Sequence, residues 1–302
     1  MVTSRALPFD VRIPILNAPM GGVAGGALAA AVSGAGGLGM IGMGSSGSVA
    51  SLQRQLPLVP NGVRVGIGLV DWVVRREPGL LDLALDAKPV LLSVSFGDDF
   101  GWIARAHERG VLTAAQIFDA EGAARAHAAG ADVIVARGRE AGGHGRHLVD
   151  RDELLDAVLA ATARPVLAAG AIATAADVRR VRERGASGAW VGTAFTACRE
   201  ALSSPAQRRA LIEAGPEDTV LTSVFDRAAG YAWPADIPER VLANDFTRRW
   251  SEEFDSEVAG RELAAANAAD DPRGMSINAG LGVGELREER SAAEVLAALA
   301  GE

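Results

Sequence analysis

The sequence predicts an α/β fold in which one (β/α)₈ barrel, a TIM barrel, is followed by a C-terminal helical and loop extension. Short apolar runs alternate with Ala-rich helical segments from about residue 10 to 202, and these runs number eight. The runs are mostly apolar instead of alternating with polar residues, as expected of parallel strands buried on both faces. A doubly wound open sheet is the competing fold. The count of eight, with phosphate-like turns late in the series, favours the barrel.

The expected strands are short and are separated by segments long enough to form crossover helices. In chain order the strands are expected at 13–18, 38–43, 63–69, 89–96, 111–117, 132–136, 165–169 and 188–191. Helices are expected at 24–33, from about 48, and at 77–86, 99–109, 119–129, 151–161 and 174–184. Thr174 followed by Asp177 is close to a capping box at the start of the last of these.

The regular alternation stops at about residue 203. Beyond it we expect helices at 204–215, 240–256 and 291–300, a strand at 220–225, a loop at 231–238 and a turn at 270–275. This extension, 203–302, carries few strand signals and could not easily build its own core. We therefore expect it to pack on the barrel as part of one domain that spans residues 1–302.

Composition excludes several classes of protein. Apolar residues make up 49% of the chain, enough for a large core, and the net charge is −8 with a pI near 5.2. A net acidic chain argues against general binding to nucleic acid or anionic membranes, which needs clustered Lys and Arg. No secretion signal or membrane-spanning stretch is evident. The one cysteine, Cys198, cannot form an intrachain disulfide, which is consistent with a cytoplasmic location.

Two glycine-containing turns follow the last two expected strands of the barrel. They are Ala169-Gly170-Ala171 after the seventh strand and Gly192-Thr193 after the eighth. In barrels the loops after strands seven and eight often build a phosphate site, because glycine permits close backbone approach and free N–H groups attract an anion. The alternative is that these glycines merely end the strands.

A second glycine-rich segment, residues 138–147, follows the sixth expected strand on the same face of the barrel. Gly142 and Gly143 would allow the backbone to approach a flat ligand. His144 is the side chain of this loop best suited to proton transfer near neutral pH. The alternative is a mobile surface loop with a solvated histidine, and His147 is expected to lie farther from any ligand or in solvent.

Two other features fall on the same face. The turn at residues 17–22 places Met20 where it could pack on an aromatic ring, although a core methionine in a tight turn fits equally well. Gln116 is a polar group in an apolar strand, so it either points into a site or is satisfied by nearby backbone. His107 and His127 fall in helices expected outside the barrel. No spacing of residues is typical of a metal site.

The motifs NAPMGG, GREAGGHG, VLAAGAI and AWVGTAF together resemble the nitronate monooxygenase (2-nitropropane dioxygenase-like) flavoproteins. VLTSVFDRAAGYAWP and RVLANDFTRRW are similar to the region of that family after its barrel, so the resemblance runs over most of the chain. It implies an FMN-containing barrel in which His144 is the catalytic base. In such enzymes the histidine takes the proton α to a nitro group, and oxidation of the nitronate by O₂ gives a carbonyl compound and nitrite.

The resemblance also implies where the cofactor would bind. The isoalloxazine would be lined by Ala18, Pro19, Met20 and Gly21, and Gln116 would reach the flavin or its ribityl chain. Beside the flavin would lie Arg137, Gly142 and Gly143. The phosphate would be held by Gly170, Ala171, Gly192 and Thr193. Three positions depart from the family pattern. Arg137 stands where Gln or Asp is usual, Ala171 where a second glycine is usual, and Gly68 where Asn is often found.

Two other functions are compatible with these motifs. One is a reductase of enoyl thioesters, of the enoyl-ACP type, that uses FMN and NAD(P)H; its family shares the barrel and a similar EAGGH loop. The other is a barrel that binds FMN or another phosphate compound without turnover. We expect a small-molecule substrate and O₂ as partners, no nucleic acid and no membrane. A homodimer could form through the extension or the exposed barrel helices.

Overall fold

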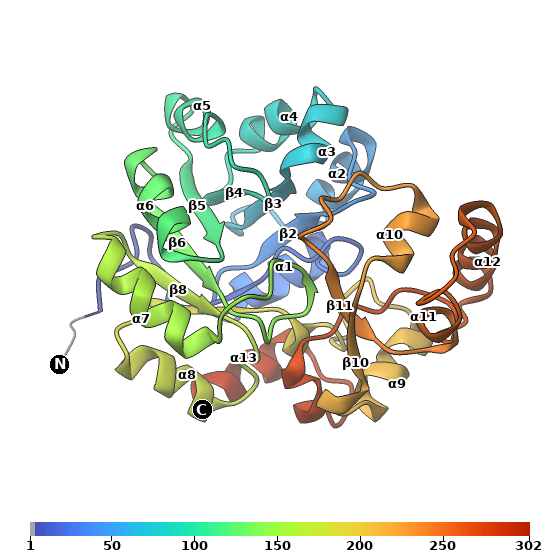
Figure 1. Cartoon of the computed structure of the whole chain (residues 1–302). Coiled ribbons are helices and arrows are strands. Elements are labelled where there is room, and N and C mark those ends of the chain that lie inside the picture. The colour runs from blue at the N-terminus through green and yellow to red at the C-terminus, as the bar shows by residue number, and fades with distance from the viewer. Residues whose placement is uncertain (1–3) are drawn as a thin grey trace.

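The computed structural model describes residues 4–302 and shows a ring of parallel strands enclosed by helices (Figure 1). The strands of the ring are β1 Ile15–Asn17, β2 Met40–Met43, β3 Gly66–Val70, β4 Leu91–Ser95, β5 Leu112–Ile117, β6 Val133–Arg137, β8 Val166–Ala169 and β9 Gly188–Val191. They pair in the order β1-β9-β8-β6-β5-β4-β3-β2, and every pair in this sheet is parallel. Each of the eight strands expected from the sequence is present, and the barrel prediction is confirmed.

The seam between β1 and β2 closes the ring. A parallel bridge joins Leu16 to Leu38. Beside it the fully buried side chain of Asn17 replaces ladder hydrogen bonds: its Oδ1 accepts from the Met40 N–H at 2.9 Å, and its Nδ2 donates to the Met40 carbonyl at 2.9 Å. A buried amide is stable only when its polar atoms are paired, as they are here. The open-sheet alternative is therefore excluded.

Helices surround the strands as the apolar pattern predicts. They are α1 Gly26–Gly34, α2 Val49–Gln55, α3 Asp71–Arg76, α4 Leu80–Asp86, α5 Trp102–Glu108, α6 Ala120–Ala128, α7 Arg151–Ala161 and α8 Ala175–Glu183. The helix expected at 77–86 is confined to α4, while α3, which directly follows β3, was not expected. Thr174 and Asp177 form the expected capping box, each side chain accepting from the other residue's N–H.

The apolar core has two main parts. One fills the barrel, where Leu16, Met40 and Trp190 meet and Phe9 of the N-terminal segment joins them. The other lies between the strands and the surrounding helices, and it includes Leu296 of the last helix. Adjacent residues of one strand point to opposite sides, so the strands contribute apolar side chains to both parts of the core.

Most of the segment after β9 lies to one side of the barrel (Figure 1), whereas its last helix packs against α1 and α8 in the ring of barrel helices. Its elements are η2 Thr193–Phe195, α9 Pro205–Glu213, η3 Pro216–Asp218, β10 Thr219–Thr222, α10 Val224–Ala229, β11 Glu239–Leu242, α11 Asp245–Arg249, α12 Ser256–Ala269, η4 Leu281–Glu285 and α13 Ala292–Ala300. A short 3₁₀ turn, η1 Leu56–Leu58, follows α2. The antiparallel sheet β10-β11-β7 joins this segment to the barrel, because β7, Gly143–His144, belongs to the loop after β6.

One expectation for this segment is wrong, and another is correct only in part. The helix expected at 240–256 is the strand β11 followed by the short helix α11, and the long helix α12 comes after it. Pairing with β10 and β7 makes residues 239–242 a strand, and only residues 245–249 of the expected range form a helix before α12 begins. The strand expected at 220–225 ends at Thr222, and Val224 begins α10 instead.

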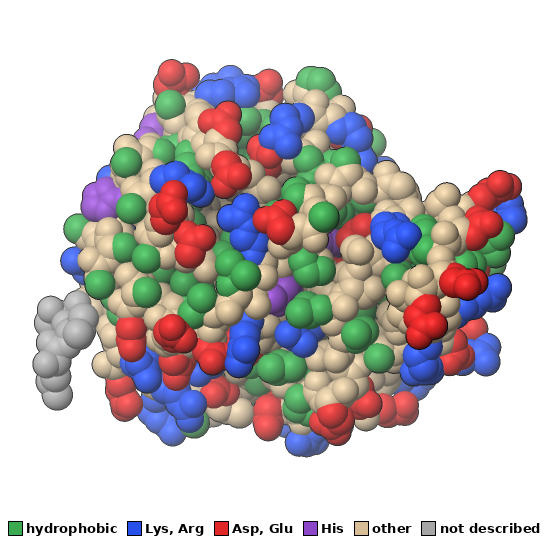
Figure 2. All heavy atoms as spheres, viewed as in Figure 1, with side chains coloured by type: hydrophobic (Ala, Val, Ile, Leu, Met, Phe, Trp, Pro, Cys, Tyr) green, Lys and Arg blue, Asp and Glu red, His purple; other side chains and the backbone are tan. Residues whose placement is uncertain are grey.

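The surface carries mixed charge. On the face shown in Figure 2, acidic and basic side chains are interspersed, and neither sign forms an extended patch. Clustered positive charge is what phosphate-backbone binding requires, and this face does not offer it. No helix within residues 4–302 is long and apolar enough to cross a membrane.

Candidate active site

A cavity of about 480 Å³ lies at the carboxyl ends of the barrel strands, where barrel active sites are found. Every residue that the sequence singled out as a candidate for the site contributes to its lining. These residues are Ala18, Pro19, Met20, Gly21, Gln116, Arg137, Gly142, Gly143, His144, Gly170, Ala171, Gly192 and Thr193. The structure therefore brings segments far apart in the sequence to one cavity large enough for a small cofactor.

The two late turns lie beside each other at one end of the cavity. Gly170 has φ +123° and Ala171 has φ +45°, so this turn uses backbone conformations that favour glycine. A Cβ added at Gly192 would lie 3.5 Å from the sulfur of Met20, on the cavity wall. The Thr193 hydroxyl oxygen accepts from the Gly280 N–H at 3.0 Å, which leaves its own hydrogen available to a ligand.

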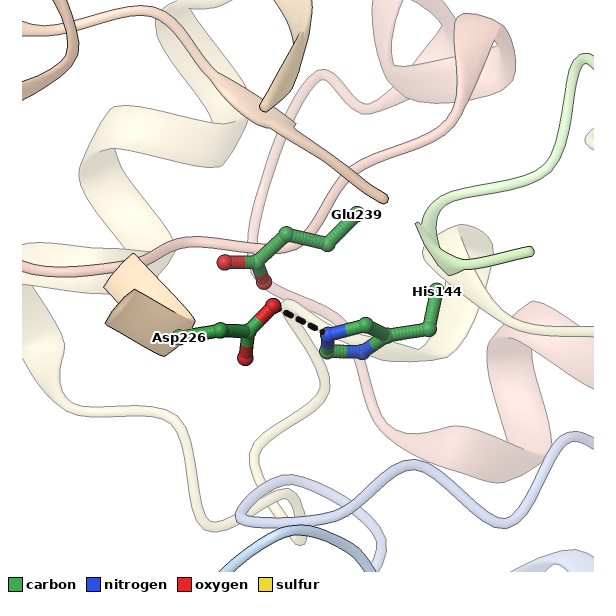
Figure 3. A group of neighbouring side chains, drawn as sticks. All are labelled: His144, Asp226 and Glu239. Carbon is green, nitrogen blue, oxygen red and sulfur yellow. Dashed lines mark hydrogen bonds and ion pairs between the residues drawn. The ribbon is translucent and has the colours of Figure 1, made fainter. Parts of the chain in front are cut away.

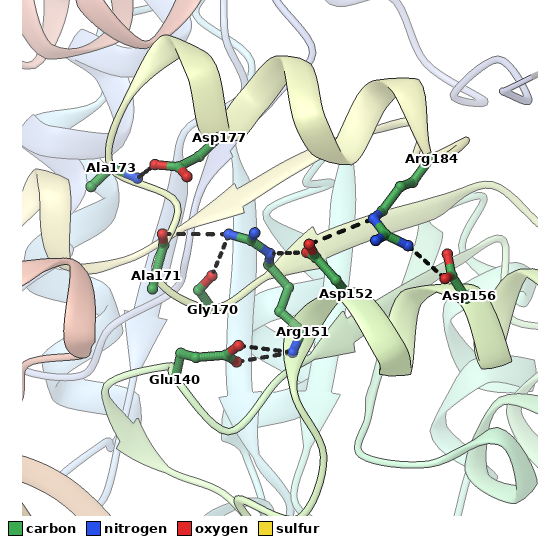
Figure 4. Close-up of polar contacts among 9 residues, drawn as sticks. All are labelled: Glu140, Arg151, Asp152, Asp156, Gly170, Ala171, Ala173, Asp177 and Arg184. Carbon is green, nitrogen blue, oxygen red and sulfur yellow. Dashed lines mark hydrogen bonds and ion pairs between the residues drawn. The ribbon is translucent and has the colours of Figure 1, made fainter.

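Arg151 ties the His144 loop to the turn after β8 (Figure 4). Its guanidinium Nη1 is buried and donates to the Gly170 carbonyl at 3.2 Å and to the Ala171 carbonyl at 3.5 Å. Its backbone N–H, at the start of α7, donates to both carboxylate oxygens of Glu140 at 3.0 Å. An acidic side chain at a helix N-terminus is favourable, so this contact stabilises the loop as well as the helix.

His144 is fixed by a carboxylate and an aromatic ring. Its Nε2 lies 2.9 Å from Oδ2 of Asp226, and both side chains are nearly buried (Figure 3). Its imidazole stacks on the Trp233 indole with ring centroids 3.6 Å apart and planes 6° apart. A carboxylate at Nε2 favours the tautomer that carries its proton there, which leaves the lone pair on Nδ1. Among residues 4–302 no hydrogen-bond partner occupies Nδ1, so this atom can accept a proton.

Glu239 completes the cluster. It is 3% exposed, its Oε1 has no hydrogen-bond partner within the described part of the chain, and its Oε2 accepts from the Ser276 hydroxyl at 3.3 Å. Single polar atoms of His144, Asp226 and Glu239 all lie within 4.8 Å of one another. Burial, and then the nearby charge of Asp226, raise the pKa of Glu239 well above its ordinary value.

Two buried polar groups on the lining fit a cofactor with hydrogen-bonding atoms. Gln116 Nε2 and Arg137 Nη1 are buried without partners among the described residues. Buried polar atoms left unpaired are costly, so partners from a ligand would be favourable here. Arg137 also donates to the carbonyl oxygens of Gly142 and Gly143, at 2.8 and 3.1 Å. Burial, followed by the charge of Arg240, lowers the pKa of Arg137 to about 9.

An aromatic group closes the outer part of the cavity around His144. The Trp233 ring meets Phe96 and Trp72 edge-on, with ring centroids 4.9 and 5.8 Å apart. Its Nε1 donates a hydrogen bond to the Ser45 hydroxyl at 2.9 Å. Phe96 has φ +70°, a strained conformation for a bulky residue and one that tends to occur at functional sites.

The sequence did not single out Asp226, Trp233 or Glu239. They belong to the segment after the barrel, where VLTSVFDRAAGYAWP had been matched to the family without roles for individual residues. That motif was the available signal for Asp226 and Trp233, whereas nothing local marked Glu239. His147 is half-buried and does not line the cavity, because its ring nitrogens approach the carbonyl oxygens of Arg139 and Gly143.

Comparison with known proteins identifies the family of this chain. A family model described as nitronate monooxygenase matches residues 53–302. The nitronate monooxygenase of Paraburkholderia phytofirmans is 34% identical over 214 residues, which cover 66% of this chain and 56% of that protein. The chain therefore spans little more than half the length of that curated relative.

Solved structures are similar over nearly the whole chain. The nitroalkane oxidase of Streptomyces ansochromogenes has a TM-score of 0.80 and 30% identity, with 97% of this chain and 96% of that chain covered. FabK of Thermotoga maritima has a TM-score of 0.80 and 25% identity, with 96% and 92% covered. With the family model matching most of the sequence, the predicted family is confirmed: this chain belongs to the nitronate monooxygenase family of flavin-dependent oxidoreductases.

Proposed function

We propose that this protein binds FMN in the cavity and oxidises nitroalkanes and nitronates with O₂, giving a carbonyl compound and nitrite. The observation that supports this most is the environment of His144. Its Nε2 is held by Asp226 and its ring face by Trp233, while Nδ1 remains free of partners within residues 4–302. A histidine oriented by a carboxylate in this way is suited to act as a general base.

Each part of the lining has a role in this proposal. The two late turns, with Gly170, Ala171, Gly192 and Thr193, would hold the FMN phosphate through backbone N–H groups and the threonine hydroxyl. Residues 18–21 and the glycines at 142 and 143 would border the flat ring system, and Gln116 and Arg137 would supply hydrogen bonds. When bound, FMN supplies the electron acceptor for the oxidation.

The chemistry of His144 begins with the nitroalkane. Its Nδ1 takes the proton from the carbon that carries the nitro group, and Asp226 stabilises the imidazolium that forms. The electron pair left on carbon moves into the nitro group and gives the nitronate. Trp233 covers one ring face and keeps the imidazole in one orientation, while the surrounding aromatic side chains limit access of water.

Similarity to FabK over 92% of its chain supports a second candidate function, the NAD(P)H-dependent reduction of enoyl thioesters. The two functions differ in what reduces the flavin. We expect the purified protein to show flavin absorbance and to change its spectrum anaerobically with ethylnitronate but not with NADH or NADPH. Bleaching by a nicotinamide alone, with turnover of an enoyl thioester, would replace the first proposal with the second. Absence of flavin bands even after reconstitution with FMN would contradict both.

The role of His144 is tested by comparing a neutral nitroalkane with its preformed nitronate. His144→Ala should slow nitroalkane oxidation by about 10²- to 10⁴-fold, the usual contribution of a general base. The nitronate needs no proton removal, so its oxidation should suffer much less. His107→Ala, on the outer face of α5, is the matched control and should leave both rates unchanged. If His144→Ala left both rates unchanged, His144 would not be the base. If the wild type oxidised neither substrate, a barrel that binds FMN without turnover would be favoured.

A further inference from the structure

Glu239 is a buried acid that the proposed chemistry does not use. It lies on β11 in register with His144 of β7, and Figure 3 shows its carboxyl group beside Asp226 and the imidazole. Charged side chains are almost never fully buried unless they are paired. Within residues 4–302 Glu239 makes no ion pair, and the one hydrogen bond to its carboxyl group comes from the Ser276 hydroxyl, at 3.3 Å.

We propose that Glu239 is a positioning residue that keeps its proton at neutral pH and so leaves Asp226 as the single negative charge beside His144. This inference rests on the proposed role of His144 as base. The titratable groups facing Glu239 are Asp226 from α10 and His144 from β7, and no Lys or Arg of the described chain pairs with it. A buried carboxyl group with an anionic neighbour and no cation favours its neutral form.

The pKa of Glu239 agrees with this geometry, since burial and the Asp226 charge raise it well above the ordinary value. Its partner Asp226 differs in environment, because its Oδ2 is hydrogen-bonded to the His144 ring. The two acids therefore have different roles, although they are neighbours. Such divergence between paired carboxyl groups is a recurring feature of active sites.

The proton on Glu239 has a consequence for catalysis. Two ionised carboxylates beside His144 would strongly favour its imidazolium form before substrate binds. That form has no lone pair on Nδ1 and cannot accept a proton. With Glu239 neutral, this second charge is absent, and the imidazolium formed during the reaction is balanced by Asp226 alone.

The test compares Glu239→Gln, which has nearly the shape of the neutral acid, with Asp226→Asn, which removes a charge. Glu257→Gln, an exposed position on α12, is the matched control. At pH 7 the wild type and the control should show the infrared band of a protonated carboxyl group that Glu239→Gln lacks. In ¹³C NMR of the full chain, the signal of the Glu239 carboxyl group is assigned by its absence from Glu239→Gln, and it should keep its protonated position at pH 7. Asp226→Asn removes the neighbouring charge and should lower the pH at which Glu239 loses its proton.

In the wild type the Glu239 carboxyl signal should move to its ionised position only above neutral pH. An ionised Glu239 signal at pH 7, with no infrared difference between the Glu257→Gln control and Glu239→Gln, would overturn the proposal. If the variant failed to fold, the wild-type infrared band alone decides: it must persist through pH 7 and decline only in alkali. Both signals are independent of turnover, so loss of the proposed oxidase function would leave them readable.

Discussion

The imidazole of His144 and the indole of Trp233 are stacked nearly parallel, with centroids 3.6 Å apart. The first comes from the loop after β6 and the second from the loop between α10 and β11, 89 positions later in the sequence (233 − 144). Asp226 holds the edge of the same imidazole. The extension after the barrel therefore determines the orientation of the residue proposed as base.

The stack predicts a graded response to substitution at Trp233. Trp233→Ala should lower kcat/KM for a nitroalkane about 5- to 30-fold, because losing an aromatic contact that orients the base costs about 1–2 kcal/mol. Trp233→Phe keeps a ring face and should recover most of the loss. Ser45→Ala removes only the hydrogen bond to the indole and separates that contribution. Equal losses in the Phe and Ala variants would show that stacking is not what matters.

The barrel was predictable from the sequence because its strands are continuous apolar runs buried on both faces. A residue such as Leu16 faces the interior and its neighbour Ile15 faces the helices, so the whole run must be apolar. The extension was harder to predict. Residues 239–242 form a strand because β7 and β10 pair with them on either side. The spacing of apolar residues within this segment does not indicate such distant pairing partners.

The same distinction applies to the site. Gly142, Gly143 and His144 are consecutive, so their chemistry could be interpreted locally, and the structure places them in the cavity. Glu239 comes beside His144 through the antiparallel pairing of β7 with β11, and Asp226 reaches the imidazole from α10, 82 positions after His144 in the sequence. A lone Asp in a helix or a lone Glu in a strand is ordinary until that pairing is known.

Gly68 departs from the family pattern for a steric reason. A Cβ there would lie 2.2 Å from Cγ of Pro19 and 3.0 Å from the Ser93 hydroxyl. Gly68→Ala should therefore displace Pro19 from the cavity wall and lower the free energy of unfolding by about 1–3 kcal/mol, as overpacking does. FMN binding and urea denaturation would measure both effects. Gly34→Ala, where no atom lies within 4 Å of the added carbon, is the matched control. A stable Gly68→Ala variant with unchanged FMN affinity would contradict this account.

Ala171 occupies a left-handed conformation, φ +45°, where a second glycine is usual in the family. A residue with a Cβ is destabilised by about 1–2 kcal/mol in that conformation. Glycine avoids this strain, but its unfolded chain is more flexible than that of alanine, which lowers the free energy of unfolding by about 0.5–1 kcal/mol. Ala171→Gly should therefore leave the melting temperature unchanged or slightly higher. Ala298→Gly, exposed within α13, should lower it. A clear loss of stability in Ala171→Gly would show that the turn is not strained.

His147 predicts a loss of stability in acid. Burial, followed by the Arg137 charge, lowers its pKa from 6.5 to about 4. Between these values the unfolded chain binds a proton that the folded protein does not, so stability is complete above pH 6.5 and falls as the pH is lowered toward 4. His147→Asn should remove this slope and also suits the left-handed backbone there, φ +49°. Urea denaturation at several pH values measures it, and an unchanged slope would contradict the assignment.

We expect substitution of Arg151 to weaken FMN binding, although the Arg151 side chain does not line the cavity. Its guanidinium holds the carbonyls of Gly170 and Ala171, and it does not line the cavity. Arg151→Met retains most of the buried side-chain volume but releases this turn, so the Kd for FMN should rise about tenfold, equivalent to about 1.4 kcal/mol. Flavin fluorescence quenching measures it. Arg184→Met, which removes an exposed arginine that also pairs with Asp152, should leave the Kd unchanged. Equal effects of the two substitutions would show that net charge, and not the turn, controls the affinity.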